Sequence, residues 1–480
     1  MKTSLAQSAI QQIEARLEES SASFARRYPG ESGRRQPIHV VYGGAQLFRA
    51  DTAVKLGGVA RRALDEYGAE PIAFARAVNL PGAAALPASA AQAAPLARRF
   101  AADPEKLRRE NRAAWLAFTV HARVREKLER EPVEDFRVDF EDGYGNRPDE
   151  EEDHHAHLVA EEMARGMSAG TLPPFLGIRI KPLSPELRAR SIRTLDIFLT
   201  ALLDATNSRL PQNFVVTLPK IVVPEQAAAL AALLEAFERA TNLDRGTLRF
   251  ELMIETPQSI MNERGESNLP RFLDASAGRL AAAHFGTYDY TASCSITAAY
   301  QTMTHPVCDF AKHMMQVAFA GTGVWLSDGA TNIMPAPPHR AHPGHKLTPK
   351  ERKENAAVVH RAWRLHAADI RHSLEGGFYQ GWDLHPAQLP TRFAAVYAFF
   401  LEGLDAAADR LKHFVEKAAK ATLIGDIFDD AATGQGLLNF FLRAVNCGAI
   451  GEAEAERRTG VTAEELRGAS FLKILKNRAR

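Results

Sequence analysis

The sequence has no excess of charge of either sign. Its 59 lysines and arginines stand against 58 aspartates and glutamates, and the formal net charge is +1. A protein that binds nucleic acid or an anionic membrane surface usually carries a basic field, and this chain has none. We therefore expect no nucleic-acid partner and no membrane partner, and we expect the ligand to be a small molecule.

Cysteines and long apolar runs are also scarce. Cys294, Cys308 and Cys447 have no CxxC spacing and cannot all pair, which favours a reducing compartment over a disulfide framework. No window approaches the roughly 20 apolar residues of a membrane span. The amino-terminal stretch reads as a polar amphipathic helix without the apolar core of a signal peptide. These features predict a cytoplasmic protein.

Two nucleotide-binding motifs do not occur. No GxGxxG follows the first apolar run, and the chain contains no GxxxxGKS/T. An open doubly wound sheet stays an alternative fold, but nucleotide binding of these two kinds is unsupported.

The sequence does contain a regular alternation of short apolar runs and longer intervals. The runs are Ile38 to Tyr42 and then FRVDFED, FLGIRIKP, FVVTLPK, RFELMIE, LAAAHFGTYD, GVWLSD and GWDLHP. Strands that alternate with helical intervals indicate parallel βαβ units. Eight such strands predict an α/β fold of the (β/α)8 TIM barrel type, whose active site lies at the carboxyl ends of the strands.

The lengths of the intervals predict the domain organisation. We expect an amino-terminal helical segment at 1–37, a barrel at 38–390 and a helical carboxyl-terminal extension at 391–480. Two insertions are expected within the barrel: a helical one at about 52–130, and a Pro-rich loop with a charged helix at about 330–375. Two roles are considered for the carboxyl-terminal extension: it forms a subunit contact, or it covers the site as a lid.

Two carboxylates stand out because each ends a buried apolar run. Glu255 follows RFELMI, and Asp289 follows LAAAHFGTY. A lone carboxylate in a low-dielectric site is costly unless a cation compensates it, and consecutive parallel strands bring their carboxyl ends side by side. We predict that Glu255 and Asp289 share one Mg²⁺ ion; the alternative is that each caps a following helix.

Other charged side chains fall at the same strand ends. They are Glu141, Asp142, Arg179, Lys181, Lys220, Asp328 and His385. Each also has a structural alternative, as an ion-pair partner, a turn residue or a buried histidine. Their concentration at strand ends favours a catalytic set, in which Arg179, Glu141, Asp142, Lys220 and His385 are the predicted catalytic residues. Gly286, Thr287 and Asp328 are the predicted substrate-binding residues, together with Arg179.

This set of side chains suits enolate chemistry. Mg²⁺ on two carboxylates leaves positions for the carboxylate and carbonyl oxygens of a 2-oxo acid, and it stabilises the enolate oxygen. Arg179 supplies permanently charged donors for the same oxygen or for the substrate carboxylate. Glu141 and Asp142 are expected to orient metal-bound water or to help position the cation.

Six motifs occur in a characteristic order: VDFEDGYG, GIRIKP, TLPKI, LMIETPQSIMN, FGTYDYTAS and LHPAQL. Together they resemble the citrate lyase beta subunit and its relatives in the HpcH/HpaI aldolase family, within the wider aldolase and malate synthase superfamily. The resemblance spans about residues 38–390. It implies a phosphoenolpyruvate/pyruvate-type barrel, with Glu255 and Asp289 as Mg²⁺ ligands and Arg179 as the substrate-binding arginine.

The same resemblance assigns the remaining strand ends. It matches Glu141 and Asp142 to the acidic pair of the second strand, Lys220 to the lysine of the fourth, and His385 to the HP motif of the eighth. It also implies a homo-oligomer. In relatives that handle acyl-CoA, a catalytic aspartate comes from a carboxyl-terminal segment, sometimes of a neighbouring subunit. Asp426, Asp429 and Asp430 are candidates for that role, and the catalytic base stays unassigned.

The leading prediction is a Mg²⁺-dependent carbon–carbon lyase or aldolase acting through the enolate of a pyruvate-like or oxaloacetate-like 2-oxo acid, or on a hydroxy acid. The sequence has no coenzyme A signature, so participation of an acyl-CoA is open. The alternatives are a phosphoenolpyruvate-utilising phosphotransferase and a non-catalytic, metabolite-binding barrel.

Two histidine clusters, His154 with His155 and His157, and His339 with His342 and His345, are predicted to be solvated loops rather than metal sites.

Overall fold

Eight parallel strands close into a barrel in the computed structural model, which describes residues 4–30, 32–343, 346–416, 422–424, 427–429 and 431–478. Each strand pairs with the next in sequence order, and β1 also pairs with β8. The strands are β1 (His39–Gly44), β2 (Asp135–Asp139), β3 (Phe175–Arg179), β4 (Phe214–Leu218), β5 (Arg249–Ile254), β6 (Leu280–Phe285), β7 (Trp325–Ala330) and β8 (Gln380–Asp383). The predicted (β/α)8 barrel is confirmed.

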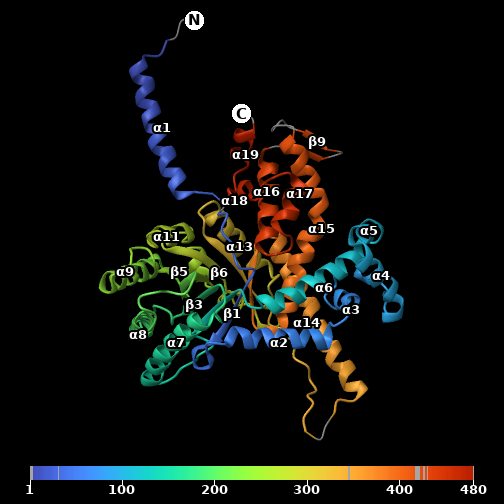
Figure 1. Cartoon of the computed structure of the whole chain (residues 1–480). Helices are drawn as coiled ribbons and strands as arrows, with labels where there is room; N and C mark the ends of the chain where they lie inside the picture. Colours follow the sequence, from blue (N-terminus) through green and yellow to red (C-terminus); the bar gives the residue numbers. More distant parts are fainter. Residues whose placement is uncertain are drawn as a thin grey trace.

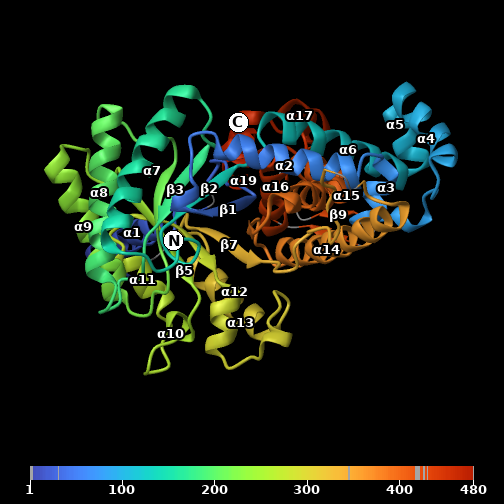
Figure 2. The ribbon, with the colours of Figure 1, turned by 90° about the horizontal axis from the view of Figure 1, so that it is seen from below.

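Crossover helices surround the barrel, as Figures 1 and 2 show for α7, α8 and α9 on one side. The apolar faces of the longer ones bury leucine, phenylalanine and alanine against the strands, as in α8 and α9. The helices between β2 and β8 are α7 (Asp149–Ala169), α8 (Arg188–Thr206), α9 (Pro224–Thr241), α10 (Pro257–Ile260), α11 (Leu269–Ala275), α12 (Thr287–Ser293), α13 (Pro306–Phe319) and α14 (Pro349–Glu375). The loop-helix segment expected before the eighth strand is present, and its helix α14 is itself the crossover from β7 to β8.

The helical insertion after the first strand is also present. It consists of α2 (Thr52–Tyr67), α3 (Pro71–Ala77), α4 (Ala90–Ala102), α5 (Pro104–Glu110) and α6 (Arg112–Arg130). Helix α6 packs against α15 (Leu389–Glu416), the long helix that follows β8, whereas α4 buries none of its residues and extends outward with α5 (Figure 1). The insertion and the carboxyl-terminal extension therefore share one side of the barrel.

The carboxyl-terminal extension continues with α16 (Ala431–Asn446), α17 (Glu452–Thr459), α18 (Ala463–Arg467) and α19 (Phe471–Arg478). It is not entirely helical, because β9 (Thr422–Ile424) and β10 (Ile427–Asp429) form an antiparallel pair. Helix α16 reaches the segment before β1, where Arg443 Nη1 donates to Gln36 Oε1 at 3.3 Å. Of the three candidate aspartates, Asp429 ends β10, while Asp426 and Asp430 lie outside the described residues.

The amino-terminal helix α1 (Gln7–Arg27) buries none of its residues and projects away from the barrel (Figure 1). Ile13, Leu17 and Phe24 lie exposed on it. No helix in the described ranges combines the length and hydrophobicity needed to cross a membrane. The homo-oligomer stays a prediction.

The first histidine cluster does not lie in a loop, contrary to expectation. His154, His155 and His157 belong to α7, whose first turn carries four consecutive acidic residues from Asp149. Acidic residues at a helix amino terminus interact favourably with the helix dipole, which explains why this charged run is helical. In the second cluster, His339 contacts Glu354 at 2.6 Å, and His345 lies outside the described residues.

Charged side chains occupy the middle of the barrel, where TIM barrels usually pack branched aliphatic residues. Arg137 of β2 donates from Nε and Nη2 to Glu251 of β5, at 2.6 and 2.9 Å. It also pairs with Asp135, and His284 of β6 contacts Glu251 at 2.8 Å. All four side chains are buried, so each charge depends on its partners.

Replacing Arg137 with methionine should lower the free energy of unfolding by about 3–5 kcal/mol, because it leaves Asp135 and Glu251 buried without their cation. Urea unfolding monitored by circular dichroism measures the change. Arg239→Met is the matched control, since Arg239 pairs with Glu235 on the exposed surface and should change stability by less than about 1 kcal/mol. Equal effects of the two substitutions would contradict a stabilising role for the interior network.

Candidate active site

The carboxyl end of the barrel is organised around Arg179, the last residue of β3. Its Nε and Nη2 atoms donate to Asp139, the last residue of β2, at 2.7 and 2.5 Å. The two residues are register partners on adjacent strands, so the side chains meet with little freedom. Burial alone would lower the pKa of Arg179, but the bonds with Asp139 raise it. Arg179 is therefore a fixed and permanently charged group.

Asp139 also shapes the loop that follows β2. Its carboxylate accepts the backbone N–H groups of Glu141 and Gly143, at 2.9 and 2.7 Å. Sequence reasoning missed Asp139, because it placed the functional acids of this strand at Glu141 and Asp142. The signal was the alternation in VDFED: Asp139 and Glu141 are two residues apart and therefore point to the same side of an extended chain.

Glu141 and Lys220 extend the charged set from Arg179 across the mouth of the barrel. Arg179 Nη1 lies 3.1 Å from Glu141 Oε2, and Lys220 Nζ contacts Glu141 and also Asp142 at 3.0 Å. Burial alone would lower the pKa of Lys220, but its hydrogen bond with Glu141 raises it. Lys220 is thus protonated at neutral pH.

Glu255 lies buried directly after β5. Its Oε1 atom accepts the backbone N–H of Lys220 at 2.7 Å. On the neighbouring strand end, Gly286 allows close approach: a Cβ there would lie 2.5 Å from Glu255 Oε2. No salt bridge joins Glu255 to a cationic side chain of the described residues.

Asp289 approaches Glu255 from the first turn of α12. Burial, and then the charge of Asp289, raise the pKa of Glu255 to about 8. Asp289 is half-buried and has no hydrogen-bond or ion-pair partner in the part of the chain that the structure describes. The structure thus brings together the two carboxylates singled out in the sequence. The charges of Arg179 and Lys220 offset part of the rise in the pKa of Glu255, but neither carboxylate forms a salt bridge within the described residues.

Thr287 contributes a hydroxyl beside these carboxylates. Its Oγ1 atom is buried without a hydrogen-bond partner among the described residues. A Cβ on Gly329 of β7 would collide with this atom, so glycine at that position makes room for the hydroxyl. A buried hydroxyl without a partner is costly, and a ligand in the mouth could supply the missing bond.

Tyr42 of β1 and Trp382 of β8 form an aromatic surface against Arg179. The guanidinium carbon lies 4.8 Å from the Tyr42 ring centroid and 5.6 Å from that of Trp382, and the two rings are 4.5 Å apart. Cation–π contacts of this kind restrict the arginine further. Neither residue was among the sequence candidates, because an aromatic residue inside a strand reads as ordinary core.

Asp328 does not join this set. It accepts hydrogen bonds from Lys312 of α13 at 3.1 Å and from Ser373 of α14 at 2.6 Å, so it faces the surrounding helices. Side chains alternate along a strand, and in β7 it is Gly329, against Thr287, that faces the mouth. Lys181 likewise turns aside, donating to the backbone oxygen of Phe140 and pairing with Glu152 of α7.

His385 follows β8 and caps the short helix η4 (Pro386–Gln388). Its Nδ1 atom accepts the backbone N–H of Ala387 at 3.1 Å, and burial lowers its pKa. The imidazole is therefore neutral at pH 7, and because Nδ1 is an acceptor, the proton is carried by Nε2. In this state His385 can donate a hydrogen bond but cannot accept a proton at Nε2.

The two carboxylates offer a suitable donor set for Mg²⁺. This ion prefers hard oxygen ligands and is commonly held by one or two carboxylates, with water and substrate filling the remaining positions. No group of three or more histidine, cysteine or acidic side chains that could enclose a metal occurs in the described residues. The arrangement of Glu255 and Asp289 fits an open site rather than an enclosed structural one.

Solved structures that are similar to this chain include two enzymes. A citrate lyase from Burkholderia xenovorans LB400 is 22% identical, with a TM-score of 0.50, over 72% of this chain and 91% of that chain. A magnesium and glyoxylate complex of Haloferax volcanii malate synthase is 14% identical, with a TM-score of 0.43, over 91% of this chain and 99% of that chain. At 22% identity the likeness to the citrate lyase concerns the fold alone.

Sequence comparison leads to a family rather than to a characterised relative. No curated protein matches the chain. The profile of one family, described as Domain of unknown function (DUF6986), matches residues 17–474 and so includes the barrel, its insertions and nearly all of the extension. The chain belongs to the DUF6986 family.

Proposed function

We propose that this protein is a Mg²⁺-dependent enzyme that makes or breaks a carbon–carbon bond next to the carbonyl of a 2-oxo acid, through an enolate. The observation that carries the proposal is the convergence of Glu255, directly after β5, and Asp289, in the first turn of α12, with no salt-bridge partner among the described residues. Two carboxylates held together in this way cost free energy unless a cation binds between them. The shared barrel fold with a citrate lyase is in keeping with this reaction class.

Mg²⁺ bound by Glu255 and Asp289 would supply a Lewis acid for the developing charge on the enolate oxygen. Hard oxygen donors favour Mg²⁺ over softer transition metals. The backbone N–H of Lys220 fixes one oxygen of Glu255 and leaves the other facing Gly286. The protein thus orients the carboxylate before any ligand arrives.

Arg179 is assigned to the substrate oxygens. Asp139 occupies its Nε and Nη2, which leaves Nη1 as the group directed toward Glu141 and the mouth. A guanidinium fixed by a bidentate pair and an aromatic surface undergoes little rearrangement during reaction, which is the condition for effective electrostatic stabilisation. Thr287 Oγ1 is assigned as a second donor, to the substrate carboxylate.

Neither Lys220 nor His385 suits the role of general base. Lys220 is protonated through its contacts with Glu141 and Asp142, and His385 uses Nδ1 to accept a backbone hydrogen bond. We assign Lys220 to holding Glu141 beside Arg179, and His385 to positioning the loop after β8. The base is proposed to come from outside this set, in line with the expectation of a carboxyl-terminal aspartate. An acyl-CoA as second substrate stays a prediction.

Glu255→Gln should stabilise the metal-free protein at alkaline pH. The pKa of Glu255 is about 8 in the folded state and near 4.5 when unfolded, so between these values the folded state binds more protons and stability falls as pH rises. The full cost is present above pH 8 and absent below pH 4.5. We expect the substitution to raise the free energy of unfolding by roughly 2–4 kcal/mol at pH 9 and by less at pH 6.

Urea unfolding in EDTA at pH 6 and pH 9 measures this difference. Added Mg²⁺ should stabilise the wild type and leave Glu255→Gln unchanged, because the substitution removes a charged ligand. Glu263→Gln, at a highly exposed acid in the following loop, is the control and should behave as wild type. A Glu255→Gln protein less stable than wild type at pH 9 in EDTA would show that the carboxylate is compensated by other groups.

Exchange of the C3 protons of pyruvate with deuterated water tests the chemistry directly. We expect wild type to catalyse the exchange with Mg²⁺, Glu255→Gln and Asp289→Asn to lose it, and Arg179→Lys to slow it by on the order of 100-fold. Proton NMR follows the loss of the methyl signal, with Glu263→Gln again as control. Exchange retained in both carboxylate variants would contradict the proposal. Pyruvate binding without exchange in the wild type would favour a non-catalytic, metabolite-binding barrel.

A further inference from the structure

A cavity with several charged residues in its lining lies at the amino-terminal end of the barrel, opposite Glu255 and Asp289. It has a volume of about 220 Å³. The first residues of several strands line it, among them Asp135 of β2, Phe175 of β3, Phe214 of β4, Arg249 of β5 and Trp325 of β7. Reaction centres of TIM barrels lie at the carboxyl ends of the strands, so this cavity is separate from the proposed reaction centre.

The charged lining of this cavity has an excess of cations. It contains Arg34, Arg137 and Arg249, against the carboxylates Asp135 and Glu251. Arg137 is fully engaged with those two carboxylates in the barrel interior. The three arginines thus outnumber the two carboxylates by one, and neither Arg34 nor Arg249 forms a salt bridge with Asp135 or Glu251.

Arg249 is the central group of this excess. It is half-buried, and its Nη2 atom donates to the backbone oxygen of Leu280 at 2.9 Å. No carboxylate in the described part of the chain forms a salt bridge with it. Its pKa is lowered by burial and then by the charge of Arg34, which is what two neighbouring cations without an anion experience. A bound anion would relieve both effects.

The walls of the cavity are apolar and partly aromatic. Phe175 and Trp325 meet edge to face with their centroids 6.0 Å apart, and the guanidinium of Arg34 lies 5.6 Å from the Trp325 ring. Phe214, Leu210 and Pro211 complete the apolar lining. Such walls favour a ligand with a flat apolar body beside its negative charge.

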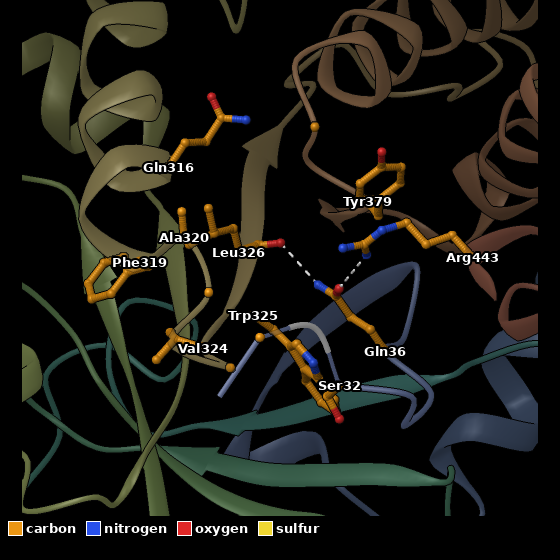
Figure 3. A pocket seen from close by; sticks show the side chains of 14 residues that line it. Ser32, Gln36, Gln316, Phe319, Ala320, Val324, Trp325, Leu326, Tyr379 and Arg443 are labelled. Carbon is orange, nitrogen blue, oxygen red and sulfur yellow. Dashed lines mark hydrogen bonds between the residues drawn. The ribbon is translucent and has the colours of Figure 1, made fainter. Parts of the chain in front are cut away.

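The adjoining pocket on the other side of Trp325 provides a contrast (Figure 3). There Gln36 donates to the backbone oxygen of Leu326 at 3.1 Å and accepts from Arg443 at 3.3 Å, as the dashed lines show. These hydrogen bonds of Gln36 connect the segment before β1 to β7 and α16. That pocket is a structural junction, whereas the cavity with Arg249 retains unused donors.

We propose that this cavity binds a small organic carboxylate with a flat apolar body, held by Arg249 and Arg34. A carboxylate matches the planar fork of a guanidinium and accepts two parallel hydrogen bonds from it. The volume is below the usual range for drug-sized ligands, so the ligand is of metabolite size. Its binding leaves the reaction centre free, as a regulatory ligand requires.

Isothermal titration calorimetry of the full chain with benzoate, in EDTA, tests the site. Benzoate should bind wild type and Glu255→Gln equally, because the mouth is not involved. Arg249→Gln should weaken binding by about tenfold or more, and Arg34→Gln by a smaller factor, since each removes charged hydrogen-bond donors. Arg245→Gln is the matched control and should bind as wild type, because Arg245 is an exposed arginine just before β5 that does not line the cavity.

Several results would overturn the proposal. They are an absence of benzoate binding, affinity that survives both Arg249→Gln and Arg34→Gln, and binding lost in Glu255→Gln, which would place benzoate in the mouth. Inorganic phosphate, which has no apolar body, should bind at least about tenfold more weakly than benzoate; equal affinity would overturn the assignment of an apolar ligand. If circular dichroism shows that Arg249→Gln does not fold, the benzoate affinity of Arg34→Gln decides the outcome, because Arg34 is exposed.

Discussion

The bidentate pair between Asp139 and Arg179 is the contact on which the carboxyl end of this barrel depends. It joins two neighbouring strands at their last residues, and the same carboxylate holds the backbone of the loop after β2. Without Asp139, Arg179 would be a buried cation with Glu141 as its remaining acidic contact. With Asp139 present, Arg179 has one defined orientation, stacked against Tyr42 and Trp382. The neighbouring side chains therefore contact a charge whose position is fixed.

Charge is distributed unevenly along the barrel axis. In the middle, Arg137 forms ion pairs with both Asp135 and Glu251, so each buried charge there has a partner of opposite sign. At the carboxyl end, Arg179 and Lys220 offset the repulsion between Glu255 and Asp289 only in part, and at the amino end the excess is cationic. A protein tolerates uncompensated buried charge where a ligand of opposite sign completes it, and both of our binding proposals follow from that rule.

The ends of the predicted strands were enough to locate much of the carboxyl face. Glu255, Asp289, Arg179, Glu141 and Lys220 do converge, because parallel strands must place their last residues on one edge. The same reasoning included Asp328, which faces the helices instead: in β7 the last inward position is Gly329, and a shift of one residue reverses the side of the sheet. It missed Asp139, since the strand boundary falls two residues earlier than the most acidic stretch suggests.

The sequence by itself determined the barrel and the approximate position of its reactive edge, because both follow from local periodicity: short apolar runs, helix-length intervals and charge at the end of each run. Only the tertiary structure decided which charges neutralise one another. The partners of Arg137 lie on β5 and on its own strand, and Arg249 and Arg34 line one cavity although they are far apart in the chain. Compensation of charge depends on distances between segments remote in sequence, and no local pattern encodes those distances.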